Sequence, residues 1–71
     1  MIVHVKVIST HHLEDAARNR RYVFRAIETE QGKAMEVERW VRLRCEYRRE
    51  MSMYVARRLW SWLRKLGYAK W

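Results

Sequence analysis

This sequence of 71 residues contains no proline, two glycines and one cysteine. A single cysteine excludes an intrachain disulfide and suits a reducing compartment better than a small secreted scaffold. With Gly32 and Gly67 alone, the chain has no glycine-rich loop of the kind that cradles phosphates. No apolar run approaches the roughly 20 residues that span a bilayer, and the start does not resemble a secretory signal. We therefore expect one small, soluble, cytoplasmic domain with a thin core over residues 1–71.

Side-chain amides are also scarce, because Asn19 and Gln31 are the only two. Arginine outnumbers lysine by 12 to 4, and these two features together suggest a thermophilic source. The charge is distributed unevenly. Residues 1–38 hold six basic and six acidic residues, whereas residues 39–71 hold ten basic and two acidic ones, which accounts for the whole net charge of +8. A one-sided positive field of this kind attracts polyanions.

The N-terminal third predicts one strand and one short helix. Val3, Val5 and Val7 alternate with polar residues, which predicts a half-buried strand over residues 1–8. A Ser-Thr pair then offers a helix N-cap, with acidic residues after it and arginines later, in the order that a helix dipole favours. This pattern predicts a short helix over about residues 11–20.

The middle of the chain predicts a β-hairpin around Gln31 and Gly32, since glycine supplies the positive φ that a tight turn needs. If Glu30 pairs with Lys33, the apolar side chains gather on one face. That face holds Tyr22, Phe24, Ala26, Met35, Val37 and Val41. The alternation continues to Tyr47, and the overhang at residues 42–48 is where we expect the first strand to pair, in a direction that the sequence leaves open.

After Ser52 the apolar period becomes helical, and Gly67 provides a stop signal. One arc of this helix gathers Val55, Ala56, Leu59, Trp60, Trp62, Leu63 and Leu66. A continuous helix over about residues 34–66 is the main alternative, but six of the seven odd positions from Met35 to Tyr47 are apolar and six of the eight even positions from Ala34 to Arg48 are charged, which favours strands. The predicted fold is therefore α+β: a three-stranded, mainly antiparallel sheet in the order β-α-β-β-α, with the C-terminal amphipathic helix packed on one face.

Two surfaces of this predicted fold combine features that suit nucleic acid. On the outward sheet face, Trp40 is expected beside arginines, where an indole can stack on an unpaired base and guanidinium groups can hold phosphates. Packing of Trp40 under the helix or in a dimer contact explains it equally well. The second surface is the polar side of the C-terminal helix, which has no acidic residue. The candidate binding residues are Arg25, Trp40, Arg42, Arg44, Arg48, Arg57, Arg58, Arg64 and Lys65.

Other chemistries find less support in the sequence. The adjacent His11 and His12 cannot share one helical face, so no metal site and no cofactor is predicted. Cys45 has no visible neighbouring base, and a cross-strand ion pair with Arg25 explains Glu38 without an active site. We therefore predict that the chain is not an enzyme. A basic helix rich in tryptophan also suits a membrane surface, although the sheet needs its apolar arc as cover.

The sequence thus predicts a protein that binds RNA or non-specific DNA through a basic sheet face and the C-terminal helix, as in a component of a ribonucleoprotein particle. A homodimer or a larger ribonucleoprotein assembly would supply the stability that a small core lacks. The alternative is a homo-oligomer or adaptor in which Trp40, Trp71 and a sheet edge form a protein interface.

Overall fold

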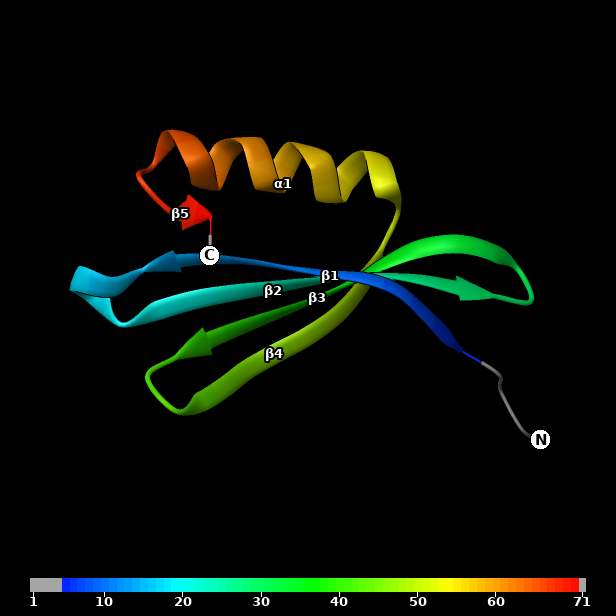
Figure 1. Cartoon of the computed structure of the whole chain (residues 1–71), viewed down its shortest axis with the longest axis horizontal. Coiled ribbons are helices and arrows are strands. Elements are labelled where there is room, and N and C mark those ends of the chain that lie inside the picture. Colours follow the sequence, from blue (N-terminus) through cyan, green and yellow to red (C-terminus); the bar gives the residue numbers. More distant parts are fainter. Residues whose placement is uncertain (1–4, 71) are drawn as a thin grey trace.

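A computed structural model describes residues 5–70 of the chain. It contains one five-stranded antiparallel sheet, in the order β4-β3-β2-β1-β5, and one long helix (Figure 1). The elements are β1 (Lys6–Asp15), the 3-10 turn η1 (Ala16–Arg18), β2 (Arg20–Thr29), β3 (Gly32–Val41), β4 (Arg44–Met51), α1 (Met53–Lys65) and β5 (Ala69–Lys70). The α+β class fits, but the prediction of three strands in the order β-α-β-β-α is wrong.

The predicted helix over residues 11–20 is replaced by the second half of β1 and by the short turn η1. Pairing with β2 along the length of β1 outweighs the local helical signals, since tertiary context routinely overrides propensity. Asn19 ends η1 with a φ of 54°, a left-handed conformation that asparagine tolerates well. The strand predicted over residues 1–8 appears in the structure from Lys6 onward, and residues 1–4 lie outside the described part of the chain.

The hairpin of β2 and β3 is confirmed, but its register differs from the predicted one by two residues. Thr29 pairs with Gly32, so Tyr22 lies opposite Arg39 and Phe24 opposite Val37. A shift of two residues leaves every side chain on the same face of the sheet. The predicted apolar face is therefore preserved, and it forms the buried side of the sheet.

The continuous strand predicted through residues 42–48 is wrong, because the chain reverses at Arg42 and Leu43 and returns as β4. Arg42 adopts a φ of 56°, and its backbone N–H donates to the carbonyl of Asn19 at 2.7 Å. This contact joins the β3–β4 turn to the β1–β2 turn. The first strand pairs with β2, not with the predicted overhang. An extra residue at Glu46 then places Cys45 and Tyr47 on opposite faces.

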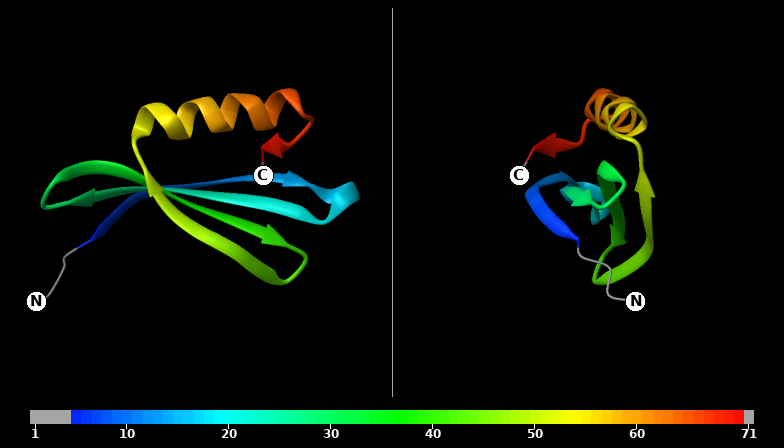
Figure 2. Two further views of the ribbon diagram at one scale, coloured as in Figure 1. Left: turned by 180° about the vertical axis from the view of Figure 1, so that it is seen from behind. Right: turned by 90° about the vertical axis from the view of Figure 1, so that its right-hand side faces the viewer.

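The C-terminal helix is confirmed as α1, and it lies along one face of the twisted sheet (Figure 2). The hydroxyl of Ser52 accepts a hydrogen bond from the backbone N–H of Val55 at 3.2 Å, which caps the helix start. Gly67 follows its end with a φ of 103°. Between helix and sheet lies a core of Leu13, Tyr22, Phe24, Met35, Val37, Ala56, Leu63 and Tyr68.

The buried arc of α1 is narrower than the sequence indicates. Ala56 and Leu63 are fully buried, and Leu59 and Trp60 pack against the core. Val55, Trp62 and Leu66 are instead about half exposed along one border of the helix. Three apolar side chains that were expected to cover the sheet therefore face outward.

Candidate functional site

The structure distributes the nine predicted binding residues over three separate places. Arg25, Trp40 and Arg48 lie on the face of the sheet away from α1, which we call the open face. Arg42 and Arg44 flank the β3–β4 turn. Arg57, Arg58, Arg64 and Lys65 lie on α1. The predicted combination of a basic sheet face and a basic helix is therefore split between opposite sides of the sheet (Figure 1).

On the open face, two of the predicted arginines are matched to a buried carboxylate. Glu38 is 1 % exposed. It accepts a hydrogen bond from Nη1 of Arg25 at 2.5 Å, and bonds from Nε and Nη2 of Arg48 at 2.8 and 2.5 Å. Glu36 lies beside them, 3.4 Å from Arg25 and 3.7 Å from Arg48. These guanidinium groups already have anionic partners within the chain.

The pKa of Glu38 reflects this arrangement. Burial raises the pKa, but the hydrogen bonds from Arg48 and Arg25 and the charges of both arginines outweigh it, so the pKa lies below the ordinary value of 4.5. The hydrogen bond to Glu38, and then the charges of Glu38 and Glu36, raise the pKa of Arg48. Glu38 is thus ionised at neutral pH, and Arg25 and Arg48 compensate its charge.

The open face as a whole is not basic. Alternation along the paired strands places three basic and four acidic residues on it. These residues are Arg21, Arg25, Arg48, Glu14, Glu36, Glu38 and Glu50. Val23 and Ile27 are each 3 % exposed, although no helix of the described part of the chain covers this face. Long side chains lying across the sheet exclude water from them. The open face therefore has the character of a polar cover for the sheet.

Trp40 is part of that cover. Its side chain is half-buried, and the guanidinium carbon of Arg21 lies 5.5 Å from the centre of its ring. Its indole Nε1 is buried and finds no hydrogen-bond acceptor among the described residues. With an arginine over its ring and part of its surface buried in the sheet, Trp40 offers less accessible ring surface to a base than an exposed side chain would.

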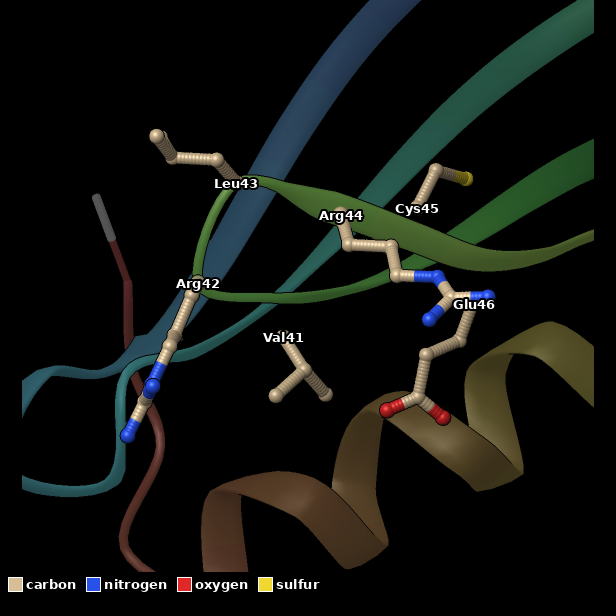
Figure 3. A pocket seen from close by; sticks show the side chains of 6 residues that line it. All are labelled: Val41, Arg42, Leu43, Arg44, Cys45 and Glu46. Carbon is tan, nitrogen blue, oxygen red and sulfur yellow. The ribbon is translucent and has the colours of Figure 1, made fainter.

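The β3–β4 turn carries two exposed arginines around a wide, shallow hollow of about 790 Å³. Figure 3 shows that the side chains of Arg42 and Arg44 point in different directions from the turn, with Leu43 directed away from both. Leu43 is 96 % exposed. The turn offers positive charge but no convergent pair of guanidinium groups.

The outer side of α1 differs from both of these places. Two columns of side chains run along it at four-residue spacing: Tyr54, Arg58 and Trp62 form one, and Arg57, Ser61 and Lys65 form the other. These six residues line a shallow hollow of about 540 Å³. The small side chain of Ser61 lies between larger neighbours, which explains the depression in the helix surface. We call this surface the helix groove.

Within residues 5–70, no carboxylate forms an ion pair with a cation of the helix groove. The chain has no acidic residue after Glu50, so residues 51–71 contribute five positive charges and no negative one. Among the described residues, none of the cations of α1 forms an ion pair. Arg64 lies outside the groove and donates from Nη1 to the carbonyl of Tyr68 at 3.1 Å, which helps to close the helix end. Arg57, Arg58 and Lys65 remain available to an external anion.

Tyr54 and Trp62 are the groove residues that sequence reasoning missed. Trp62 was assigned to the buried arc, yet it is 56 % exposed, and Tyr54 is 68 % exposed. The sequence did contain a signal for their exposure, namely the breadth of the apolar arc of the helix. One helix can bury only a stripe of its circumference against a sheet. Residues at the border of a broad apolar arc are the ones left outside.

Two further findings concern metal sites and membrane-spanning helices. Among residues 5–70, no three side chains of histidine, cysteine, aspartate or glutamate gather as a metal site would require. In the same part of the chain, no helix has the length and apolar character needed to cross a membrane.

Comparison with known proteins finds no family model, no curated protein and no solved structure that matches this chain.

Proposed function

We propose that this protein binds RNA or DNA through the helix groove of α1. The observation that carries the proposal is the concentration of cations on one helix face that holds no acidic residue and forms no ion pair among the described residues. Solvated helices ordinarily mix charges of both signs. The uncompensated charges of Arg57, Arg58 and Lys65 instead sum to a positive potential over one surface, which attracts anions. A phosphate backbone supplies such anions at regular spacing.

The sheet supports this function as a scaffold and contributes little to binding. Its open face carries Arg25 and Arg48, but both are occupied by Glu38 and Glu36. A phosphate approaching this face would have to displace a carboxylate from two charge-assisted hydrogen bonds. The groove has no such competitor. The single thiol of Cys45 suits a reducing compartment, so we place this function in the cytoplasm.

Neutralising two groove cations tests the proposal. The variant Arg58→Gln/Lys65→Gln spares Arg64, because Arg64 closes the helix. The control Lys6→Gln/Lys33→Gln removes two exposed lysines from the sheet and lowers the net charge of +8 by the same two units. Affinity for a single-stranded and a duplex oligonucleotide is measured by fluorescence anisotropy at several salt concentrations.

The expected result is a loss of affinity in the groove variant and little change in the control. Two lost phosphate contacts should also reduce the slope of log K against log salt by about 1.4 for single strands and about 1.8 for duplex DNA. Equal effects of the two variants would show that only net charge matters, and would remove the helix groove from the proposal.

A homo-oligomer is the second candidate, and the outer edge of β1 favours it. β5 pairs with β1 at Leu13 and Glu14 alone, and the rest of that edge has no strand partner within residues 5–70. Val7 and Ile8 on this edge are 52 % and 48 % exposed. Unprotected edges of this kind pair readily with another strand, here that of a second copy. Light scattering should then detect a dimer that Ile8→Lys dissociates, whereas a monomer at every concentration would exclude it.

A further inference from the structure

Two exposed aromatic rings border the helix groove, and they stand in one column with a guanidinium group between them. Tyr54, Arg58 and Trp62 follow one another at intervals of four residues. The guanidinium carbon of Arg58 lies 5.9 Å from the centre of the Tyr54 ring. The groove therefore combines planar apolar surfaces with positive charge.

Trp62 is not held in place by the core, in contrast to its near neighbour Trp60. The ring of Trp60 meets Phe24 edge-on at a centroid distance of 5.1 Å and His11 at 6.2 Å. No ring among the described residues packs against Trp62, which is 56 % exposed. Exposing a large aromatic side chain forgoes the free energy that its burial would contribute. Trp62 therefore has a free face that a ligand can cover.

We propose that the helix groove takes single-stranded nucleic acid, with Tyr54 and Trp62 each stacking on an unpaired base while Arg57, Arg58 and Lys65 hold the intervening phosphates. This inference rests on the proposed function and narrows it to one class of ligand. In a duplex the base faces are covered by their neighbours, so neither ring could use its stacking surface there.

The spacing of the two rings also favours a flexible strand. Tyr54 and Trp62 lie eight positions apart on the α-helix, a rise of about 12 Å along the axis. Stacked bases repeat every 3.4 Å or so along a strand, so the rings cannot contact adjacent stacked bases. Each ring receives a separate, splayed base. A single strand can splay its bases at little cost, whereas a duplex must first unpair.

An anionic membrane surface is the competing ligand, because Val55 and Leu66 extend the apolar border beside Trp62. Nucleic acid and a membrane require different properties of the side chain at position 62. Stacking requires an aromatic ring, while insertion among lipid headgroups requires apolar area that leucine also supplies. Trp62→Leu and Trp62→Phe therefore separate them, since only phenylalanine retains a stacking face. Residue 62 is exposed, so neither substitution should disturb the core.

The experiment measures binding of the full chain and both variants to four probes. These are oligouridylate and oligothymidylate of about ten nucleotides, a duplex of oligothymidylate with its complementary strand, and phosphatidylcholine vesicles containing phosphatidylserine. The groove spans about 17 Å of helix axis, from residue 54 to residue 65. A stacked strand needs about five nucleotides to cover that length, so about ten are sufficient. We expect single strands to bind more tightly than the duplex. Trp62→Leu should weaken single-strand binding by roughly 5- to 150-fold, and Trp62→Phe should restore most of it.

A fluorescence measurement on the unmodified protein provides a second readout, with Trp62→Phe as the reference. Stacking on a base should quench the emission of Trp62, so the quenching of the unmodified protein by oligouridylate should exceed that of Trp62→Phe. A preference for the ribose or the deoxyribose strand would identify the natural sugar and support the inference in either case.

The other outcomes are also decisive. Equal affinity for single strands and duplex, or unchanged affinity in Trp62→Leu, would overturn the stacking inference and leave nucleic-acid binding by the groove standing. Binding of vesicles without binding of any oligonucleotide would overturn the proposed function together with the inference.

Discussion

Replacing Glu38 by glutamine should destabilise the protein strongly, although the two side chains have nearly the same shape. Glu38 lies at the centre of the open face, 1 % exposed, and accepts hydrogen bonds from Arg25 and Arg48. Glutamine keeps one oxygen acceptor but removes the negative charge. It also directs an amide donor toward a guanidinium group that cannot accept a hydrogen bond.

The expected loss of stability depends on how deeply Glu38 and its two arginine partners are buried. Removing one partner of a fully buried ion pair costs about 3–5 kcal/mol. Arg25 and Arg48 expose 31 % and 62 % of their side chains, so water can solvate part of the abandoned charge. We therefore expect Glu38→Gln to lower the free energy of unfolding by about 2 kcal/mol. For a domain of this size, that loss corresponds to a decrease in Tm of roughly 8–16 °C.

The pH dependence identifies the charge of Glu38 as the cause. Its folded-state pKa lies below 4.5, so its stabilisation is complete above the pKa of the unfolded chain and is lost as the pH falls through the folded pKa. Urea denaturation should therefore show the full difference between the protein and Glu38→Gln near neutral pH. That difference should shrink as the pH falls below about 4.5.

A triple variant provides the control. Glu38→Leu alone leaves the two arginines with only the partly exposed Glu36 as an anionic partner. Glu38→Leu combined with Arg25→Met and Arg48→Met removes Glu38 together with both arginines that donate hydrogen bonds to it. The triple variant should recover most of the stability lost in the single one. A stability change of less than about 0.5 kcal/mol in Glu38→Gln, or a difference independent of pH, would refute the reasoning.

Three further predictions concern local structure. Ser52→Ala should lower stability by about 1 kcal/mol, because it removes the N-cap of α1, while Ser52→Asp should retain it; thermal unfolding measures both. Burial and then the charges of Arg21, Arg25 and His11 lower the pKa of His12 below 6.5, so stability to urea should decline as the pH falls below about 6.5, and His12→Asn should flatten that decline. Arg42→Gly should be tolerated, or should stabilise by up to about 1 kcal/mol, because φ is 56° there, whereas the same change at Arg44, within β4, should destabilise.

The elements that the sequence predicts well are those whose signals are local. Ser52 and Gly67 mark the ends of α1, and the Gln31-Gly32 pair marks the β2–β3 hairpin, so both elements are found where expected. The apolar face of that hairpin also survives, because an error of two residues in register does not change which side chains share a face. Period and capping are properties of neighbouring residues, which a sequence displays directly.

The elements that were missed depend on contacts between distant residues. The β3–β4 turn contains neither glycine, proline nor asparagine, and the alternation of apolar residues continues through it, so nothing local marks the reversal at Arg42. That turn is secured by the hydrogen bond to Asn19, more than twenty positions earlier in the chain. The second half of β1 likewise becomes a strand because β2 is available to pair with it. From the sequence alone, the β3–β4 turn therefore resembles part of a continuous strand, and the second half of β1 resembles a helix.

The same distinction applies to the candidate site. The number of arginines predicts a basic sheet face. However, the electrostatic effect of an arginine depends on which carboxylate lies beside it. Glu38 neutralises Arg25 and Arg48, which lie on its two neighbouring strands, and the sequence does not reveal that β4 is one of them. On α1, neither the helix nor the segment after it holds an acidic residue, and among the described residues no strand supplies a carboxylate to the helix cations. The first of these facts is visible in the sequence, whereas the second depends on how the strands are placed. A stretch without acidic residues therefore predicts uncompensated cations better than the overall charge does, because fewer of their possible partners remain to be placed.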